Sequence, residues 1–261
     1  MSSLIRPVVI VGNWKMYKTI EETEEFLKEL IPLVPKKSPK VLLAVPFTAI
    51  QAASKLVKRI NISIGAQNMN DASEGAFTGE IAGRMIAEAG GVFVVLGHSE
   101  RRRRFGETNA FINLKVKRAL KDKLLPILCI GETAQQREEG KTQFVLKEQI
   151  LECLEGVDPQ QVAQIYLAYE PIWAIGTGLT ATSEEIEKMH QFCRDCLSEK
   201  WGKEISEKVV ILYGGSVNPE NAGRLLGEPE VDGLLVGGAS LSPQDFSQII
   251  NCQVEPVPGQ N

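Results

Sequence analysis

Eight short apolar runs, rich in β-branched residues, constrain the fold of this chain more than any other feature of its sequence. They recur at intervals of roughly 20 to 40 residues and show no clear alternation of apolar and polar positions, which is typical of parallel strands buried on both faces. The runs are residues 8–11, 41–45, 62–66, 92–96, 126–130, 165–169, 209–213 and 234–236. We therefore expect eight parallel strands.

Amphipathic helical segments lie between these runs, and residues 20–31, 110–121, 144–154 and 184–199 are examples. Thr182 and Glu185 form a capping-box pattern at the start of the last one. Eight strand–helix units in 261 residues suit a closed barrel, whereas a doubly wound sheet usually has fewer strands and a marked switch point. We predict an α/β protein with the (β/α)₈ TIM-barrel fold. Since no linker or shift in composition divides the chain, one domain over residues 1–261 is expected.

Charge and cysteine usage exclude several classes of protein. A net charge of -4 argues against nucleic-acid binding, so that an anionic ligand would need a local positive field. The five cysteines are an odd number scattered along the chain and predict reduced thiols in the cytoplasm. Neither a signal peptide nor a membrane span is evident in the sequence, so no membrane partner is expected.

Polar residues and glycines follow the predicted strands directly. In a barrel the carboxyl ends of all strands meet at one mouth, which is the catalytic face. These residues are therefore expected to share a pocket: Asn13, Lys15, His98, Glu170, Ser216, Gly237 and Gly238.

Each charged candidate also has a purely structural interpretation. Lys15 alone would be a solvated loop lysine, and His98 is as readily a structural histidine as a catalytic one. Glu170 could simply terminate a strand, but Pro171 biases it toward an extended backbone, which suits a fixed proton-transfer base. His190 lies in a predicted helix, on a surface or packing face.

Glycines supply two further parts of the expected site. The loop after Glu170 is stiff and apolar, and Gly176 and Gly178 leave backbone amides open to a ligand, so that we expect a closing lid. Glycine pairs follow the last two strands, where barrels commonly bind phosphate. Tight turns would explain one such pair alone, but both together favour a phosphate monoester ligand.

Two other patterns could indicate a binding site, but their surroundings favour structural roles. The run from Arg101 to Arg104 could form a nucleic-acid patch, but nearby glutamates favour an ion-paired helix start. Cys193 and Cys196 have metal-ligand spacing, yet they lie inside a predicted helix without a second pair. Neither a metal nor an organic cofactor is expected.

Taken together, six motifs resemble those of the triosephosphate isomerase family in order and spacing along nearly the whole chain. The motifs are GNWK (12–15), GHSERR (97–102), CIGE (129–132), YEP with GTG (169–178), YGGS (213–216) and VGG (236–238). The resemblance implies an isomerase that interconverts dihydroxyacetone phosphate and D-glyceraldehyde 3-phosphate through an enediolate. A glutamate base, a neutral histidine and a closing loop are the established pattern of this family.

The resemblance also implies individual roles. Glu170 would be the base, His98 the neutral electrophile, Lys15 the cation beside the substrate, and Asn13 a hydrogen-bond donor to it. Glu100 would be a carboxylate beside Lys15. The backbone amides of the remaining positions would hold the phosphate: Gly176, Ser216, Gly237 and Gly238.

The segment 67–80 is far longer than most connections, which suggests an interaction element and not only a solvated loop. In the family this loop inserts into a neighbouring subunit. The resemblance therefore implies a homodimer with Met16, Thr78, Gly79 and Glu80 at or near the contact. Whether dimers associate further into tetramers is left open.

Two competing functions remain at this point. A relative of indole-3-glycerol-phosphate synthase would need an added N-terminal segment and several catalytic lysines, which the sequence does not show. A catalytically silent sugar-phosphate-binding barrel would be favoured by loss of Glu170, His98 or Lys15, and all three are present.

Overall fold

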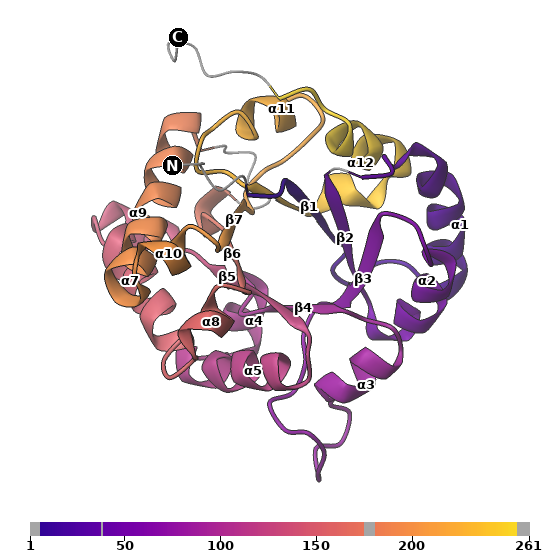
Figure 1. Cartoon of the computed structure of the whole chain (residues 1–261), viewed down its shortest axis with the longest axis horizontal. Coiled ribbons are helices and arrows are strands. Elements are labelled where there is room, and N and C mark those ends of the chain that lie inside the picture. Colours follow the sequence, from indigo (N-terminus) through magenta and orange to yellow (C-terminus); the bar gives the residue numbers. More distant parts are fainter. Residues whose placement is uncertain (1–5, 38, 175–180, 255–261) are drawn as a thin grey trace.

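A computed structural model describes residues 6–37, 39–174 and 181–254, and in it eight parallel strands close into a barrel (Figure 1). The strands follow one another around the barrel in sequence order, and β1 pairs with β8 to close it. They are β1 Val9–Asn13, β2 Lys40–Val45, β3 Ile62–Ala66, β4 Phe93–Leu96, β5 Leu125–Ile130, β6 Tyr166–Tyr169, β7 Val210–Tyr213 and β8 Gly233–Val236. The predicted fold is confirmed. The ends of each expected strand lie within two residues of the ends of the observed strand.

Helices surround the barrel on its outside (Figure 1). The α-helices are α1 Ile20–Leu30, α2 Ile50–Leu56, α3 Gly83–Glu88, α4 Ser99–Phe105, α5 Asn109–Lys121, α6 Ala134–Glu138, α7 Thr142–Cys153, α8 Pro159–Val162, α9 Ser183–Trp201, α10 Lys203–Ser206, α11 Ala222–Leu225 and α12 Pro243–Ile250. Shorter 3₁₀ helices are η1 Ile31–Leu33, η2 Phe47–Ala49, η3 Ile172–Ala174 and η4 Gly238–Leu241. The Thr182–Glu185 capping box is confirmed at α9. Among the described residues, no helix is long and apolar enough to cross a membrane.

The strands are buried on both faces because alternate residues enter two different cores. Val9 and Val11 point into the barrel interior, while Ile10 between them packs in the layer under the helices. Phe93 fills the interior beside Gly65, where an added Cβ would lie 2.4 Å from the Phe93 ring. This double burial explains why the strands show no simple alternation in the sequence.

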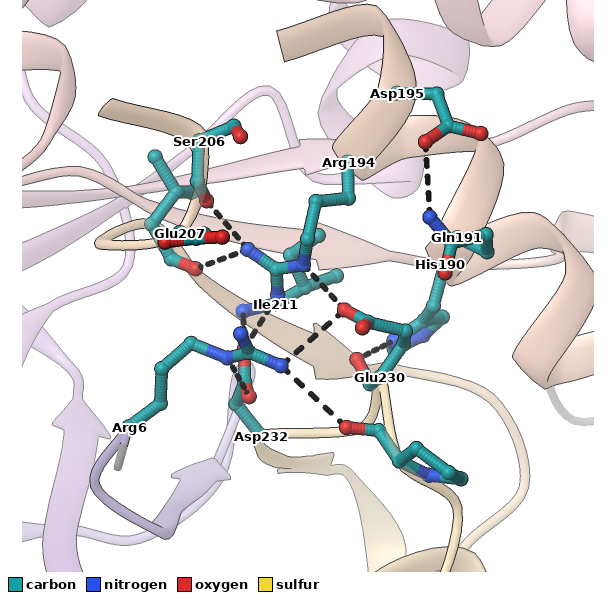
Figure 2. Close-up of polar contacts among 12 residues, drawn as sticks. Arg6, His190, Gln191, Arg194, Asp195, Ser206, Glu207, Ile211, Glu230 and Asp232 are labelled. Atoms are coloured by element: carbon teal, nitrogen blue, oxygen red, sulfur yellow. Dashed lines mark hydrogen bonds and ion pairs between the residues drawn. The ribbon is translucent and has the colours of Figure 1, made fainter. Parts of the chain in front are cut away.

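A network of buried salt bridges connects the amino ends of β7, β8 and β1 (Figure 2). The guanidinium group of Arg194 contacts both Glu230 and Asp232, and it also donates to the backbone carbonyls of Ser206 and Val209. Arg6 contacts the same two carboxylates from the segment before β1. The barrel end opposite the strand carboxyl termini is thus held by fixed charges, which is the end that serves stability in this fold.

His190 of α9 belongs to the packing, which confirms one of the two expected placements. It is fully buried between Tyr169 and Tyr213, with ring centroids 5.9 and 6.4 Å away. Its Nδ1 lies 3.0 Å from the backbone oxygen of Glu230. Burial lowers the pKa of His190 to about 4, so this side chain is neutral at physiological pH.

Candidate active site

The carboxyl ends of the strands surround a cavity of about 280 Å³. Every pocket residue expected from the strand ends lines it: Asn13, Lys15, His98, Glu170, Ser216, Gly237 and Gly238. These residues lie at the carboxyl end of β1 or in the segments after β1, β4, β6, β7 and β8, so that only the closed barrel brings them together. Gly176 and Gly178, expected in the lid, lie outside the described residues.

The cavity contains a facing carboxylate and imidazole. Oε1 of Glu170 lies 3.1 Å from Nε2 of His98, and Oε2 accepts a hydrogen bond from the backbone N–H of Ser99 at 3.4 Å. Both side chains are almost completely buried. A carboxylate beside a neutral ring donor can accept a proton from a ligand while the ring polarises a ligand oxygen.

The surroundings of His98 identify which ring nitrogen carries the proton. His98 is the N-cap residue of α4, and its Nδ1 accepts a hydrogen bond from the backbone N–H of Glu100 at 3.3 Å. An accepting Nδ1 places the proton on Nε2, which then donates to Glu170. Burial lowers the pKa of His98, but the facing Glu170 carboxylate, together with Glu100, gives a net rise. The part that comes from the charge of Glu170 is lost when this carboxylate takes up a proton.

Lys15 brings a positive charge to the cavity in a strained conformation. Its φ is 52°, in the left-handed region, and its backbone N–H donates to Oδ1 of Asn13 at 3.1 Å. Its ammonium group lies 2.9 Å from Oε1 of Glu100. Partial burial raises the pKa of Glu100, but Lys15 more than offsets this and holds the net pKa below its usual range. Such strain in a non-glycine residue is common where function fixes a side chain.

The glycines of the cavity serve two separate purposes. At Gly214 an added Cβ would lie 2.7 Å from Cγ of Glu170, so this position allows the carboxylate to pack closely. At Gly238 an added Cβ would meet nothing within 4 Å, and at Gly237 only Cε of Lys15 at 3.8 Å. These last two glycines leave the backbone accessible from the cavity, as an anion site beside a lysine requires.

Glu132 is the last residue of the CIGE motif after β5, and no role in the site was predicted for it from the sequence. Its side chain contacts residues on both sides of Glu170 in the sequence. Its Oε1 accepts hydrogen bonds from Nε1 of Trp173 at 2.8 Å and from the hydroxyl of Tyr169 at 3.2 Å. Burial raises its pKa in spite of these donors. Glu132 therefore connects β5 to both ends of the segment that carries Glu170.

The arginine run and the two cysteines of α9 form no second site among the described residues. Arg101 pairs with the buried Glu107 at 2.7 Å, as expected of an ion-paired helix start. Cys193 and Cys196 lie inside α9 and are buried. Within 6–37, 39–174 and 181–254, no group of three or more His, Cys, Asp or Glu side chains could hold a metal ion.

A slightly larger cavity, about 310 Å³, lies outside the barrel beside α1. Its lining is Tyr17, Lys18, Glu22, Glu25, Phe26, Glu29, Leu241 and Pro243. Three glutamates there would repel an anion, and the lining holds no histidine beside a carboxylate. The chemistry therefore belongs to the barrel mouth.

The long segment 67–80 connects β3 to α3 and projects away from the barrel (Figure 1). Its base is fixed, because Asn70 donates to Oε2 of Glu80 at 2.9 Å and bonds the backbone of Ile81. Its tip is exposed at Phe77, Thr78 and Gly79. The segment thus presents an apolar ring on a structured base.

Comparison with known proteins gives one consistent result. Residues 8–253 match the family model described as triosephosphate isomerase. The protein named triosephosphate isomerase from Protochlamydia amoebophila is 54% identical over 96% of this chain and 95% of its own length, and the one from Dictyoglomus thermophilum is 47% identical over 94% and 99%. A crystal structure of triosephosphate isomerase from Bartonella henselae superposes with a TM-score of 0.85 at 36% identity, covering 94% of this chain and 98% of that one.

Proposed function

The chain belongs to the triosephosphate isomerase family and interconverts dihydroxyacetone phosphate and D-glyceraldehyde 3-phosphate, and we propose that Glu170 is the base of this reaction. The observation that carries the proposal is the Glu170–His98 contact of 3.1 Å inside a cavity that also holds Lys15. The matches are to isomerases along the whole barrel, which favours an active enzyme over a catalytically silent sugar-phosphate-binding barrel.

In the proposed mechanism Glu170 removes a proton from the carbon next to the substrate carbonyl and returns it to the neighbouring carbon. The intermediate is an enediolate, whose negative charge needs donors placed in advance. We assign this stabilisation to the ammonium group of Lys15 and the Nε2–H of His98, with Asn13 donating to a substrate oxygen. Glu100 acts on Lys15, because its carboxylate lies 2.9 Å from the ammonium nitrogen.

His98 acts as a neutral acid in this scheme. The backbone N–H of Glu100 already occupies its Nδ1, so only Nε2 has a proton to exchange with the enediolate oxygens. The carboxylate that raises the pKa of His98 becomes neutral once it holds the substrate proton, which favours the neutral ring at the step where it is needed.

The phosphate group is proposed to bind the backbone amides of Ser216, Gly237 and Gly238, with Gly176 completing the grip when the lid closes. The open space at both glycines of the β8 loop supports this assignment. Closure would exclude water and protect the enediolate from losing phosphate.

The His98→Gln variant tests the proposed acid. Glutamine keeps a neutral donor of similar reach but cannot lose and regain a proton, so kcat is expected to fall about 10²-fold while KM changes little. A coupled assay in both directions measures this. An unchanged kcat would mean that His98 only packs the site.

We also propose a homodimer through the 67–80 segment. The connections after β1 and β3 expose apolar side chains, with Met16 95% exposed and Phe77 50% exposed. Thr78, Gly79 and Glu80 lie beside Phe77, and all three are exposed. A monomer would leave these two apolar side chains in water, whereas a subunit contact would cover them.

Sedimentation velocity is expected to give a dimer for the wild type and a monomer for Met16→Asp, because the introduced charge would be buried in the contact. Phe144→Asp is the matched control, since Phe144 is 67% exposed on α7 and lies outside the proposed contact. A monomeric wild type, or a dimer that survives Met16→Asp, would contradict the proposal.

We also propose the domain organisation, the location and the metabolic role of the protein. Residues 1–261 form one domain, supported by the pairing of the first strand with the last. The protein acts in the cytoplasm, supported by the thiols of Cys129, Cys153, Cys193 and Cys196, which are buried and form no disulfide. Its place is in glycolysis and gluconeogenesis, supported by the triose phosphates it interconverts.

A further inference from the structure

We propose that Gln149, on the outer helix α7, is a positioning residue that fixes the end of β5 and through it the carboxylate of Glu170. The inference rests on the role proposed for Glu170 as the base. Gln149 does not line the cavity, and nothing in its helical sequence surroundings suggests a part in the reaction.

The side-chain amide of Gln149 binds both backbone groups of one residue. Its Oε1 accepts from the N–H of Gly131 at 2.8 Å, and its Nε2 donates to the carbonyl of Gly131 at 3.2 Å. The β5–β6 ladder ends just before this point, at the pair Ile130 and Tyr169. The amide therefore supplies the hydrogen bonds that a neighbouring strand would give to the first residue beyond β5. Gln149 is only 8% exposed, so these hydrogen bonds are shielded from water.

Gly131 in turn touches the backbone of Glu170. An added Cβ at Gly131 would lie 1.8 Å from the carbonyl oxygen of Glu170, so the two backbone segments are in direct contact here and leave no space for a side chain. One residue earlier, the carbonyl of Ile130 accepts from the N–H of Glu170 at 2.7 Å. One residue later, the carbonyl of Glu132 accepts from the N–H of Ile172 at 3.1 Å. The segment held by Gln149 thus supports Glu170 from both sides.

A loosened Gly131 would allow the Glu170 carboxylate to move relative to its target carbon. Small errors in placement are costly in catalysis, and 1 Å can cost about 10²-fold in rate. The proposed phosphate groups at Ser216, Gly237 and Gly238 follow β7 and β8, and no hydrogen bond joins these described residues to Gln149. Loss of Gln149 should therefore lower kcat far more than it weakens binding.

The Gln149→Met variant keeps the length of the side chain and removes both hydrogen bonds. We expect kcat to fall roughly 10-fold, because part of the misplacement penalty applies. KM, and the inhibition constant of glycerol 3-phosphate, which carries the phosphate but no carbonyl, should each change less than about 2-fold, because binding does not depend on the carboxylate position.

Asn113→Leu is the matched control. Asn113 is 7% exposed, and its Nδ2 donates to the carbonyls of Cys153 and Glu155, both at 2.9 Å, at the C-terminal end of α7 and away from Gly131. The control also removes two side-chain hydrogen bonds to backbone, one of them buried, so it should lower the melting temperature without lowering kcat. Equal losses of kcat in Gln149→Met and Asn113→Leu would overturn the proposal, because they would indicate general destabilisation.

Gln149→Asn is a second variant, for the case in which Gln149→Met does not fold. It keeps a buried amide, but its side chain is one methylene too short to reach both backbone groups of Gly131. A kcat between those of wild type and Gln149→Met supports the proposal, and a wild-type kcat overturns it.

The Gln149→Met change in a Glu170→Gln background separates this proposal from the assignment of the base. If Gln149 acts through the carboxylate, the double variant should lose no more activity than Glu170→Gln alone, whereas a further 10-fold loss overturns the coupling. Retained activity in Glu170→Gln itself would instead overturn the role of the base.

Discussion

Replacing Glu170 with glutamine is expected to lower kcat by on the order of 10³-fold in both directions of the reaction, with the fold intact. Glutamine has nearly the same shape, so it can still accept from the backbone N–H of Ser99 and pack against Gly214. It cannot accept the substrate proton, and loss of a general base typically costs 10²- to 10⁴-fold. Purified wild type and variant would be assayed side by side without added metal.

Glycerol 3-phosphate binding is the control for this experiment. The variant should bind it as the wild type does, because the phosphate contacts are proposed to come from the loops after β7 and β8. A Glu170→Gln variant within 10-fold of wild-type kcat would show that another group removes the proton. Parallel loss of binding and kcat would show that glutamine had disturbed the cavity as a whole.

Replacing Arg194 with methionine is expected to lower the free energy of unfolding by about 3 to 5 kcal/mol, which is the typical cost of breaking a buried ion pair. Only 7% of this side chain is exposed, and its removal leaves the Asp232 carboxylate with one cation fewer. Burial raises the pKa of Asp232 even with both guanidinium groups present, so the carboxylate is already poorly compensated. Urea unfolding followed by circular dichroism measures the loss.

Arg84→Met is the control for this second prediction. Arg84 pairs with Glu74 at 2.7 Å, but the two side chains are 56% and 71% exposed, so the loss should stay below about 1 kcal/mol. Folded Arg194→Met should keep its kcat, because the network lies at the amino ends of the strands, opposite the cavity. A loss below about 1 kcal/mol for Arg194→Met would mean that the network is not needed for stability.

The strands and the cavity could be predicted because their signals are local. Each strand is a short apolar run, and the polar residue after it occupies the same edge in every unit of a parallel barrel. Asn13, Lys15, His98 and Glu170 therefore line one cavity as expected.

Other features depend on contacts that no local pattern records. The left-handed backbone of Lys15 cannot be read from its neighbours, since glycine and asparagine are the usual signals for that conformation. Gln149 is a polar position in an otherwise ordinary helix, and its partner Gly131 becomes apparent only when α7 packs against β5. Arg102 likewise donates to the carbonyls of Gly97 and Cys129, a role that the arginine run does not suggest.

The pairing of β1 with β8 has a consequence for how this protein meets other chains. Each of the eight described strands has a hydrogen-bonded neighbour on both sides, so the native barrel offers no sheet edge to which a foreign strand could add. Aggregation through strand addition would first require two neighbouring strands of the barrel to separate. Contact with a second molecule must instead use side chains that project from the surface, such as Phe77 on the segment between β3 and α3.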